Sequence, residues 1–515
     1  MPALAALVLL SSSPSALAQT RPTPAATPNL PSLGDTERED LSPALERKLG
    51  EEIMRDIRAD HDYLDDAPIL EYLGDFGNSL VAARPGVRGE TGYDFFFFAV
   101  RDGRLNAFAL PGGFIAVHSG LLLAAQSESE LASVLSHEIG HVAQRHIARM
   151  LGQQRQDALI PLAGLVLAAL ASRAGGDAAI GAFMASEGVA MQRQLNFSRN
   201  AEREADRIGF QIMGEAGFDT SGMVAFFGRL QTSSRSYSEL TPAYLQSHPL
   251  TTERIADIQA RVREQAYRQR PDSLDFHLVR ARARVLQDES VQGQQETQAY
   301  FDSQLQLQSR PQVAAAQYGM ALLALKKGDL AKAQSWLDSA RASAEKAPAM
   351  SAGSFGMAPP ASLPNPIFAS LALDIQLAPG QAPQMAKQAL KAADAARQQF
   401  PLSRGIARQY AQALAGAGQL ERAVSFLRDQ VRQYRQEPKL YDLLAKTYAQ
   451  QGKQALQHIA LAESYLQNGG TMAALDQLAI ARKATDATFY DQSVIDARER
   501  ELQARRREEL KANRK

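Results

Sequence analysis

The spacing of apolar and polar residues predicts one charged helix followed by a small β-sheet. Ser42 before Pro43 is a helix-start signal, a capping residue followed by proline at the first helical position. The helix that it opens should run to about Ala59. Three strand-like runs follow, the last two around a Pro-Gly-Gly turn: Tyr93 to Val100, Ala107 to Leu110 and Phe114 to Val117.

Two further helices show a buried face. Ser127 and Glu130 form a capping box, and the apolar residues after it recur at i, i+3 and i+4, which predicts a helix to about Met150. The next helix should start after Ser198 and end near Gly217. The apolar run between them, 158–171, is too short to span a bilayer. A buried helix or mobile lid is one interpretation, and contact with a membrane surface or a substrate is the other.

Beyond about residue 270 the composition becomes rich in Ala, Gln, Leu and Arg, with almost no strand signal, which is typical of stacked helical hairpins. Small residues reproduce the spacing of a tetratricopeptide repeat twice, and Gly452 follows Gly418 by 34 residues, the period of that repeat. The two sets are Ala321, Gly328, Ala333, Leu337 and Ala340, and Ala411, Gly418, Ala423 and Leu427. A charged, solvated helix from Ala497 should end the chain.

Composition narrows the possible functions of the 515 residues. The 56 Lys and Arg balance the 56 Asp and Glu, which argues against a dedicated nucleic-acid binder. The absence of cysteine excludes disulfides, a thiol nucleophile and any Cys-ligated metal. A metal site would need carboxylates and some of the eight histidines.

The first residues are typical of an export signal. An apolar run, a Ser/Pro-rich stretch and Ala-Leu-Ala at 16–18 predict a signal peptide over 1–18. No basic residue precedes Arg21, so an apolar tail is the alternative. The proline-rich residues 19–35 should form a flexible linker. No later segment has the ~18 continuous apolar residues of a spanning helix, so we expect an exported chain without a transmembrane span, in the bacterial periplasm.

The segment 137–141 carries the clearest chemical signal, because it reads His-Glu-Ile-Gly-His on the capped helix. His137 and His141 lie at i and i+4 on one face and can present imidazole nitrogens to one Zn²⁺. The intervening Glu138 leans toward the open coordination position, where it can act as general base. Two structural histidines on an amphipathic helix are the alternative.

A catalytic zinc site needs a third protein ligand, here a carboxylate or another histidine. Glu202 and Asp206 lie at i and i+4 on the next helix. Glu202 can therefore bind metal while Asp206, one turn away, supports a ligand or donates a proton. Glu204 should face solvent. From spacing alone, a surface salt bridge is the alternative for Glu202.

Together with the segment 106–113, these motifs resemble the gluzincin peptidases related to HtpX and the CAAX prenyl proteases. The chain is similar to one periplasmic branch of this family, the beta-barrel assembly-enhancing proteases, because it combines a predicted signal peptide, no transmembrane helix and C-terminal repeats. The resemblance covers about 36–515. It implies one zinc ion and the following roles: His137, His141 and Glu202 as ligands, Glu138 as general base and Asp206 as proton donor. It also implies that 106–117 includes an edge strand that takes unfolded substrate by strand addition.

His248 stands before Pro249, which biases it toward an extended backbone. In the resembled branch such a histidine can fill the fourth zinc position and keep the enzyme latent; a role in the transition state and a structural role are the alternatives. Arg254 could stabilise an oxyanion or lie on a helix surface. We interpret His118 and His146 as structural. The spacing of the remaining histidines is not that of metal ligands: His61, His277 and His458.

We therefore predict a mainly α-helical chain. A gluzincin-type metallopeptidase domain with a small β-sheet should occupy 36–269, and an α-helical tetratricopeptide-like solenoid 270–515, with an inserted loop near 348–366. The predicted function is a periplasmic zinc endopeptidase that acts on unfolded or misassembled outer-membrane beta-barrel proteins and helps their assembly. Resemblance implies the outer-membrane beta-barrel assembly machinery as a partner. The alternative is a repeat-based scaffold or chaperone with a latent zinc site.

Overall fold

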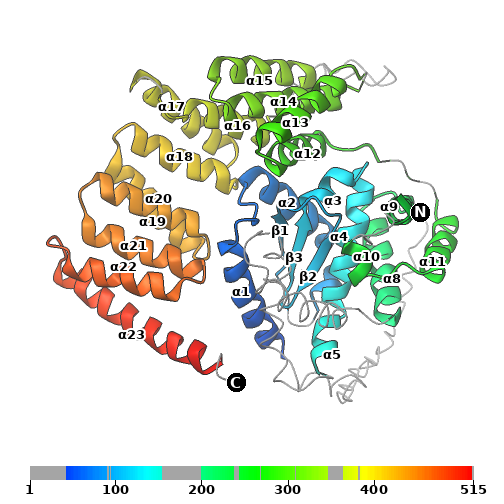
Figure 1. Cartoon of the computed structure of the whole chain (residues 1–515), viewed down its shortest axis with the longest axis horizontal. Coiled ribbons are helices and arrows are strands. Elements are labelled where there is room, and N and C mark those ends of the chain that lie inside the picture. Colours follow the sequence, from blue (N-terminus) through cyan, green and yellow to red (C-terminus); the bar gives the residue numbers. More distant parts are fainter. Residues whose placement is uncertain are drawn as a thin grey trace, which may run out of the picture.

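The computed structural model describes residues 42–89, 92, 94–152, 199–236, 243–266, 268, 270–307, 309–345, 364–380 and 383–512. The signal peptide (1–18), the linker (19–35), the run 158–171 and most of the inserted loop near 348–366 lie outside these residues. Helices and a small sheet form the peptidase half, and helices alone form the repeat half (Figure 1). The predicted fold class is confirmed.

The first helices begin at the caps that the sequence provides. Helix α1 (Pro43–Ala59) starts where Ser42 Oγ accepts a hydrogen bond from Leu45 N at 3.3 Å. Asp66 caps α2 (Ala67–Ala83) in the same way, and the short 3-10 helix η2 (Pro85–Arg88) follows.

The sheet has the order β1-β3-β2. Strand β1 (Phe96–Val100) runs parallel to β3 (Phe114–His118), while β2 (Ala107–Leu110) is antiparallel to it. The turn between β2 and β3 needs glycine, because Gly112 has φ +76° and a Cβ there would lie 2.6 Å from Cα of Arg47. Within the described residues, β1 and β2 therefore form the two edges of the sheet.

Helix α4 (Glu128–Ala143) follows α3 (Ser119–Ala124) and lies at the centre of the peptidase half, packed against β2, α2, α8 and α9. The prediction that it runs to about Met150 is wrong. The chain breaks at Arg145, a non-glycine residue with φ 52°, and restarts as α5 (His146–Gly152). Arg145 Nε lies 3.0 Å from Oε2 of the buried Glu46, an ion pair that holds this strained turn.

The second predicted helix is α8 (Arg199–Glu215), and Gly217 follows it with φ +76°, as expected for a C-terminal cap. The remaining helices of the peptidase half are α9 (Ser221–Ser236), α10 (Ala243–Ser247) and α11 (Thr252–Arg263). Two glycines allow α4 and α8 to approach closely. A Cβ at Gly140 would lie 2.9 Å from the carbonyl oxygen of Ala205, and one at Gly209 would lie 3.0 Å from N of His137.

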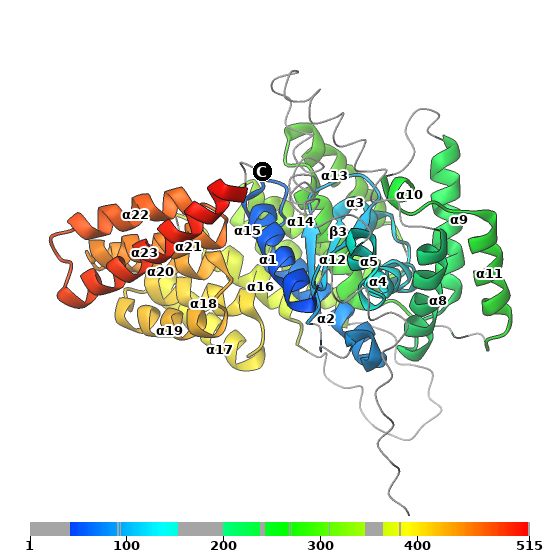
Figure 2. The same ribbon diagram turned by 90° about the horizontal axis from the view of Figure 1, so that it is seen from below.

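The repeat half is a curved stack of helical hairpins along one side of the peptidase half (Figures 1 and 2). Gly328, Gly418 and Gly452 lie in turns between paired helices with φ of +73° to +78°, as the repeat spacing predicts. The helices are α12 (Leu274–Gln287), α13 (Val291–Gln304), α14 (Arg310–Lys326), α15 (Leu330–Glu345), α16 (Pro366–Gln376), α17 (Pro383–Gln399), α18 (Arg404–Gly416), α19 (Leu420–Gln433), α20 (Pro438–Gln450), α21 (Gln454–Gln467), α22 (Thr471–Lys483) and α23 (Phe489–Ala512).

Buried polar contacts tie the two halves together. Arg282 of α12 donates to both oxygens of Asp66, the cap of α2, at 2.6 and 2.8 Å. Glu128, the first residue of α4, accepts hydrogen bonds from N and Oγ of Ser273, which caps α12. Because these groups are desolvated, breaking either pair leaves an uncompensated charge, so the repeat helices are held firmly on the peptidase half.

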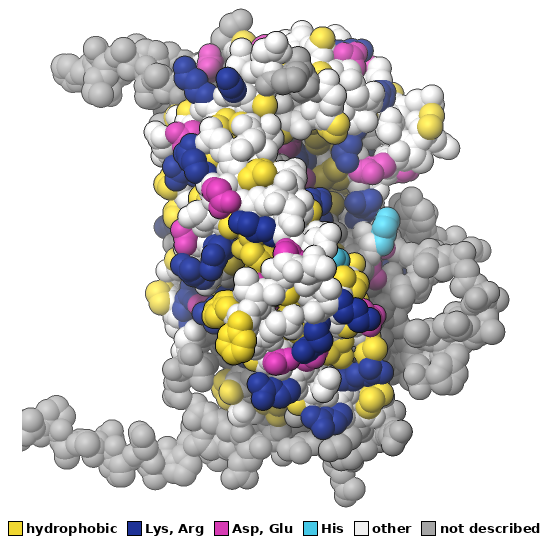
Figure 3. All heavy atoms as spheres, turned by 90° about the vertical axis from the view of Figure 1, so that its left-hand side faces the viewer, with side chains coloured by type: hydrophobic (Ala, Val, Ile, Leu, Met, Phe, Trp, Pro, Cys, Tyr) yellow, Lys and Arg dark blue, Asp and Glu magenta, His cyan; other side chains and the backbone are white. Residues whose placement is uncertain are grey.

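On the surface, the face formed by the repeat helices carries basic and acidic side chains next to one another (Figure 3). This mixture agrees with the balanced composition of the chain. Among the described residues, no helix is both long enough and apolar enough to cross a bilayer.

Candidate metal centre

Four buried side chains from three parts of the chain converge beneath the sheet's β2 edge. They are His137 and His141 of α4, Glu202 of α8, and His248 just after α10, and one donor atom from each lies within 4.8 Å of all the others. The sequence predicted all four. The helical i, i+4 spacing brings the first two together, and the close approach of α4 and α8 brings Glu202 to them.

The distances between these donor atoms suit a metal. His137 Nε2 lies 3.0 Å from His141 Nε2 and 3.3 Å from His248 Nδ1. Glu202 Oε1 lies 3.4 Å from His141 Nε2 and 3.0 Å from His248 Nδ1. Ligands at 2.0–2.1 Å from a tetrahedral Zn²⁺ are about 3.3 Å from one another. Three imidazole nitrogens and a carboxylate oxygen therefore fit one small divalent ion.

Glu138 lies beside this cluster and is fully buried. Its Oε1 is 3.5 Å from Nε2 of His248, the ring nitrogen that does not face the other three ligands. Burial raises the pKa of the Glu138 carboxyl above its ordinary value. A carboxylate with a raised pKa next to a metal position has the property expected of a general base.

Asp206 supports His137 from behind. Its Oδ1 lies 2.9 Å from His137 Nδ1, and both of its oxygens accept hydrogen bonds from Arg254, at 2.6 and 2.8 Å. Burial alone would raise the pKa of Asp206, but the bonds from Arg254 and His137 hold it below its usual range. This geometry favours the support of a ligand, one of the two roles considered for Asp206, over proton donation.

Arg254 is buried, so the interpretation of this residue as a helix-surface arginine is wrong. Besides Asp206, its guanidinium contacts Glu202 Oε2 at 2.8 Å and donates to the carbonyl of Pro249. These contacts occupy the guanidinium and leave it poorly placed to bind an oxyanion. They fix the positions of Asp206, Glu202 and the backbone next to His248 relative to one another.

A second group supports a ligand, His141, and no sequence pattern indicated it. Nδ1 of His141 lies 2.8 Å from Nδ1 of His146, whose Nε2 lies 3.1 Å from Oε2 of Glu204. Burial lowers the pKa of His146, and a neutral ring can accept a hydrogen bond from Nδ1–H of His141 at its Nδ1 and donate one from Nε2–H to Glu204. Glu204 is only half-exposed and also pairs with Arg149 at 3.1 Å, which corrects the expectation that it simply faces solvent.

Protonation competes with a metal at this site. Burial would lower the pKa of His137, but its contacts with Asp206 and Glu202 raise it to about 10. A metal at Nε2 must displace that proton, so metal binding should weaken as the pH falls. Burial lowers the pKa of His141, which favours the neutral form that binds metals.

The other histidines are not part of the cluster. His118 ends β3, where its Nδ1 lies 3.2 Å from Oδ2 of Asp102, and this agrees with a structural role. His61 is exposed, and His458 pairs with Gln477 within the repeats. The expectation of an edge strand within 106–117 is confirmed, because β2 lies at an edge of the described sheet, against α4.

Comparison with known proteins supports the same chemistry. The family model described as Peptidase family M48 matches residues 78–262. A Vibrio cholerae protein is 43% identical over 256 residues, which make up 49% of this chain and 51%, about half, of that protein. The beta-barrel assembly-enhancing protease of Escherichia coli K12 is 30% identical over 91% of this chain and 90% of its own length. Its namesake from Yersinia pestis is 30% identical over 95% of each chain.

The match to these proteases runs through both halves of the chain, and the site has the donor set that a metallopeptidase of this kind requires. The family and the cluster together indicate a bound metal ion. The chain therefore belongs to the beta-barrel assembly-enhancing proteases of peptidase family M48 and is a metalloendopeptidase.

Proposed function

We propose that this chain is a zinc-dependent endopeptidase of the bacterial periplasm. It acts on unfolded or misassembled outer-membrane beta-barrel proteins and gives chaperone-like help to their assembly. The observation that carries the proposal is the convergence of His137, His141 and Glu202 next to the buried Glu138. The names of the relatives support the substrate class, and the signal-peptide pattern supports export.

Zinc fits the donor set better than magnesium or calcium, because those ions prefer an all-oxygen shell. When bound, zinc supplies a Lewis acid that polarises a peptide carbonyl and lowers the pKa of water. His137, His141 and Glu202 would hold the ion. Glu138 would take a proton from the attacking water and pass it to the leaving nitrogen, which its raised pKa favours. Asp206, with both oxygens engaged, would orient His137.

Substrate would reach the site as an added strand. Strand β2 is a sheet edge next to α4, and an extended peptide paired with it would pass the metal position in a defined direction. A folded barrel has no free strand to offer, because all its strands are paired. Selection of unfolded chains would follow from this geometry. In the proposed division of labour, residues 36–269 perform the chemistry and 270–515 dock partners such as the beta-barrel assembly machinery.

The rival function is a scaffold or chaperone that works through the repeats and has a latent site. The close approach of His248 Nδ1 to Glu202 and His137 favours latency, because a fourth protein ligand leaves a tetrahedral ion without an open position. Loss of Glu138 separates the two functions, since only the peptidase depends on it.

The substrate class can be tested with one barrel protein in two states. We expect the zinc-loaded enzyme to cleave a urea-unfolded outer-membrane barrel and to leave the same barrel intact when it is folded in detergent. Chelation should stop cleavage and added zinc should restore it. Gel time courses would measure both. An unfolded soluble protein of equal length is the control for barrel preference, and cleavage that persists without metal, or that is equal for the folded barrel, would contradict the proposal.

The ligand assignment predicts a graded loss of zinc affinity. Glu202→Gln should show the largest loss, because it removes the anionic ligand. His146→Gln should weaken zinc binding by roughly 10- to 100-fold, the usual effect of losing a group that orients a ligand. Competition with a chromophoric chelator measures both, with His458→Gln in the repeats as the matched control. Wild-type affinity in His146→Gln would show that the His141–His146 contact does not orient the ligand.

A further inference from the structure

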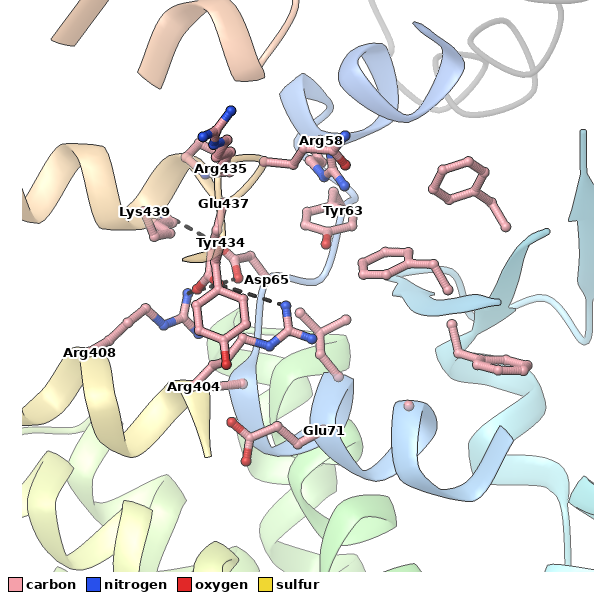
Figure 4. Close-up of a pocket in the computed structure, with 18 of the residues that line it drawn as sticks. Arg58, Tyr63, Asp65, Glu71, Arg404, Arg408, Tyr434, Arg435, Glu437 and Lys439 are labelled. Atoms are coloured by element: carbon pink, nitrogen blue, oxygen red, sulfur yellow. Dashed lines mark hydrogen bonds and ion pairs between the residues drawn. The ribbon is translucent and has the colours of Figure 1, made fainter. Parts of the chain in front are cut away.

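A large cavity lies where the two halves of the molecule meet. It has a volume of about 1040 Å³ and lies between the outer side of β1, helices α1 and α2, and the repeat helices α18 to α20 (Figure 4). Strand β2, which runs past the metal centre, is at the other edge of the sheet. The cavity is therefore distinct from the candidate metal centre.

The wall formed by β1 presents unpaired backbone. The odd-numbered residues of this strand turn their N–H and C=O groups away from β3, because Phe96 N bonds to Gly113 O on the β3 side while Ala99 O accepts from Leu64 N on the outer side. Residues 62–64 thus pair with the end of β1. No described residue pairs with the outward backbone of Phe97, which lines the cavity.

Seven basic and six acidic residues line the cavity, so its charges leave a small positive remainder. Asp65 and Glu437 are shared among Arg408 (3.3 and 3.5 Å), Lys439 (4.0 Å from Asp65) and Arg404 (3.8 Å from Glu437). Those contacts account for two of the six carboxylates that line the cavity, and Glu71 is engaged by Ser403 and the backbone N–H of Gly405.

Two further arginines line the cavity and form no ion pair with a carboxylate of the described residues: Arg58 of α1 and Arg435 of the α19–α20 loop. Arg58 donates a hydrogen bond to the Tyr63 hydroxyl and lies within the electrostatic reach of Glu437. Both arginines reach the same end of the cavity in Figure 4. The guanidinium of Arg58 lies 5.7 Å from the ring centroid of Phe96 on β1, which places a cation next to the open strand edge.

We propose that this cavity binds an extended acidic segment of a partner polypeptide. The segment adds as a short strand to the outer edge of β1, with its backbone paired to Phe97, and its carboxylates meet Arg58 and Arg435. An open strand edge selects extended chain, and two guanidinium groups without an ion pair among the described residues select carboxylates. Since β1 and β2 are opposite edges of the sheet, a partner can occupy this cavity while a substrate lies at the metal centre.

The test uses the full chain with Glu138→Gln, so that the peptide stays intact. A fluorescein-labelled decapeptide of alternating aspartate and valine is titrated and followed by fluorescence anisotropy. We expect saturable binding that weakens with salt and does not change when the metal is chelated. Arg58→Gln with Arg435→Gln should weaken it by about tenfold or more, from the loss of charge-assisted hydrogen bonds. Arg428→Gln, an exposed arginine of α19 outside the cavity, should bind as the parent does.

Two matched peptides test the remaining parts of the proposal. A lysine-valine peptide should bind far more weakly, and an N-methylated acidic peptide should also lose affinity because it cannot donate backbone hydrogen bonds to Phe97. The proposal is overturned if the acidic peptide does not bind, if the double variant binds it as the parent does, if the basic peptide binds equally well, or if N-methylation has no effect.

Discussion

Replacing Glu138 with glutamine should abolish proteolysis while the fold and the bound metal stay in place. Glutamine has the size of glutamate but cannot accept a proton at neutral pH, so the ligands remain and the base is lost. General-base catalysis contributes about 10²- to 10⁴-fold to rate, and we expect a loss of at least that size. Initial rates on an unfolded barrel protein, at equal zinc content, measure it.

Stability provides the control for this variant. Glu138 is fully buried and burial raises its pKa, so the charged carboxylate costs folding free energy above its unfolded-state pKa. Glutamine removes that cost, and the thermal midpoint of Glu138→Gln should equal or exceed that of the wild type. A zinc-loaded variant with wild-type turnover would refute the mechanism, and a lowered midpoint would mean that lost activity reports misfolding.

Local periodicity was enough to predict the centre of the site. His137, Glu138 and His141 depend on one helix, and their relative positions follow from 3.6 residues per turn. Glu202 and Asp206 follow from the same rule on the next helix. The two helices can approach closely because Gly140 and Gly209 have no side chains at the contact. The spacing within each helix does not predict this tertiary contact.

The groups that support the ligands could not be found in this way. His146 reaches His141 because the helix breaks at Arg145, a non-glycine residue in a left-handed conformation that has no local sequence signal. Arg254 looks like any arginine of a polar helix, and it is buried because Asp206, 48 positions earlier, lies opposite it. Side-chain burial of this kind is decided by packing between elements that are distant in the chain.

The repeat half was predictable as a class but not in its contacts. Glycine spacing predicted the turns of the hairpins, whereas the ion pairs of Arg282 with Asp66 and of Arg408 with Asp65 join residues more than 200 positions apart. Those pairs place α18 opposite β1 and so create the interdomain cavity. A binding site formed by two halves of a chain leaves no contiguous motif in either half.

Removing the imidazole of His248 should activate the enzyme. Nδ1 of His248 lies 3.0 Å from Glu202 Oε1 and 3.3 Å from His137 Nε2, and its Nε2 lies 3.5 Å from Glu138. In the proposed latch, the ring would take the fourth ligand position and would also cover Glu138, the proposed general base. His248→Ala frees both, while His137, His141 and Glu202 remain to hold the metal. If the ring blocks at least nine tenths of the molecules, activity should rise by about tenfold or more.

A fall in the activity of His248→Ala would be equally informative, because it is the result expected if the His248 ring acts on the substrate. His248 stacks on Tyr244, with ring centroids 4.7 Å apart, and its backbone N–H bonds to the Tyr244 carbonyl at 2.8 Å. Arg254 holds the next residue by donating to the Pro249 carbonyl. To act on a substrate, the ring would have to leave the ligands while these contacts keep it at the site. Time courses at equal zinc content would compare wild type, His248→Ala, and His248→Ala with Glu138→Gln. The single variant should exceed wild type in substrate cleavage and self-cleavage, and the double variant should show neither. Unchanged or lower activity in His248→Ala would reject the latch and assign the ring to catalysis or to structure.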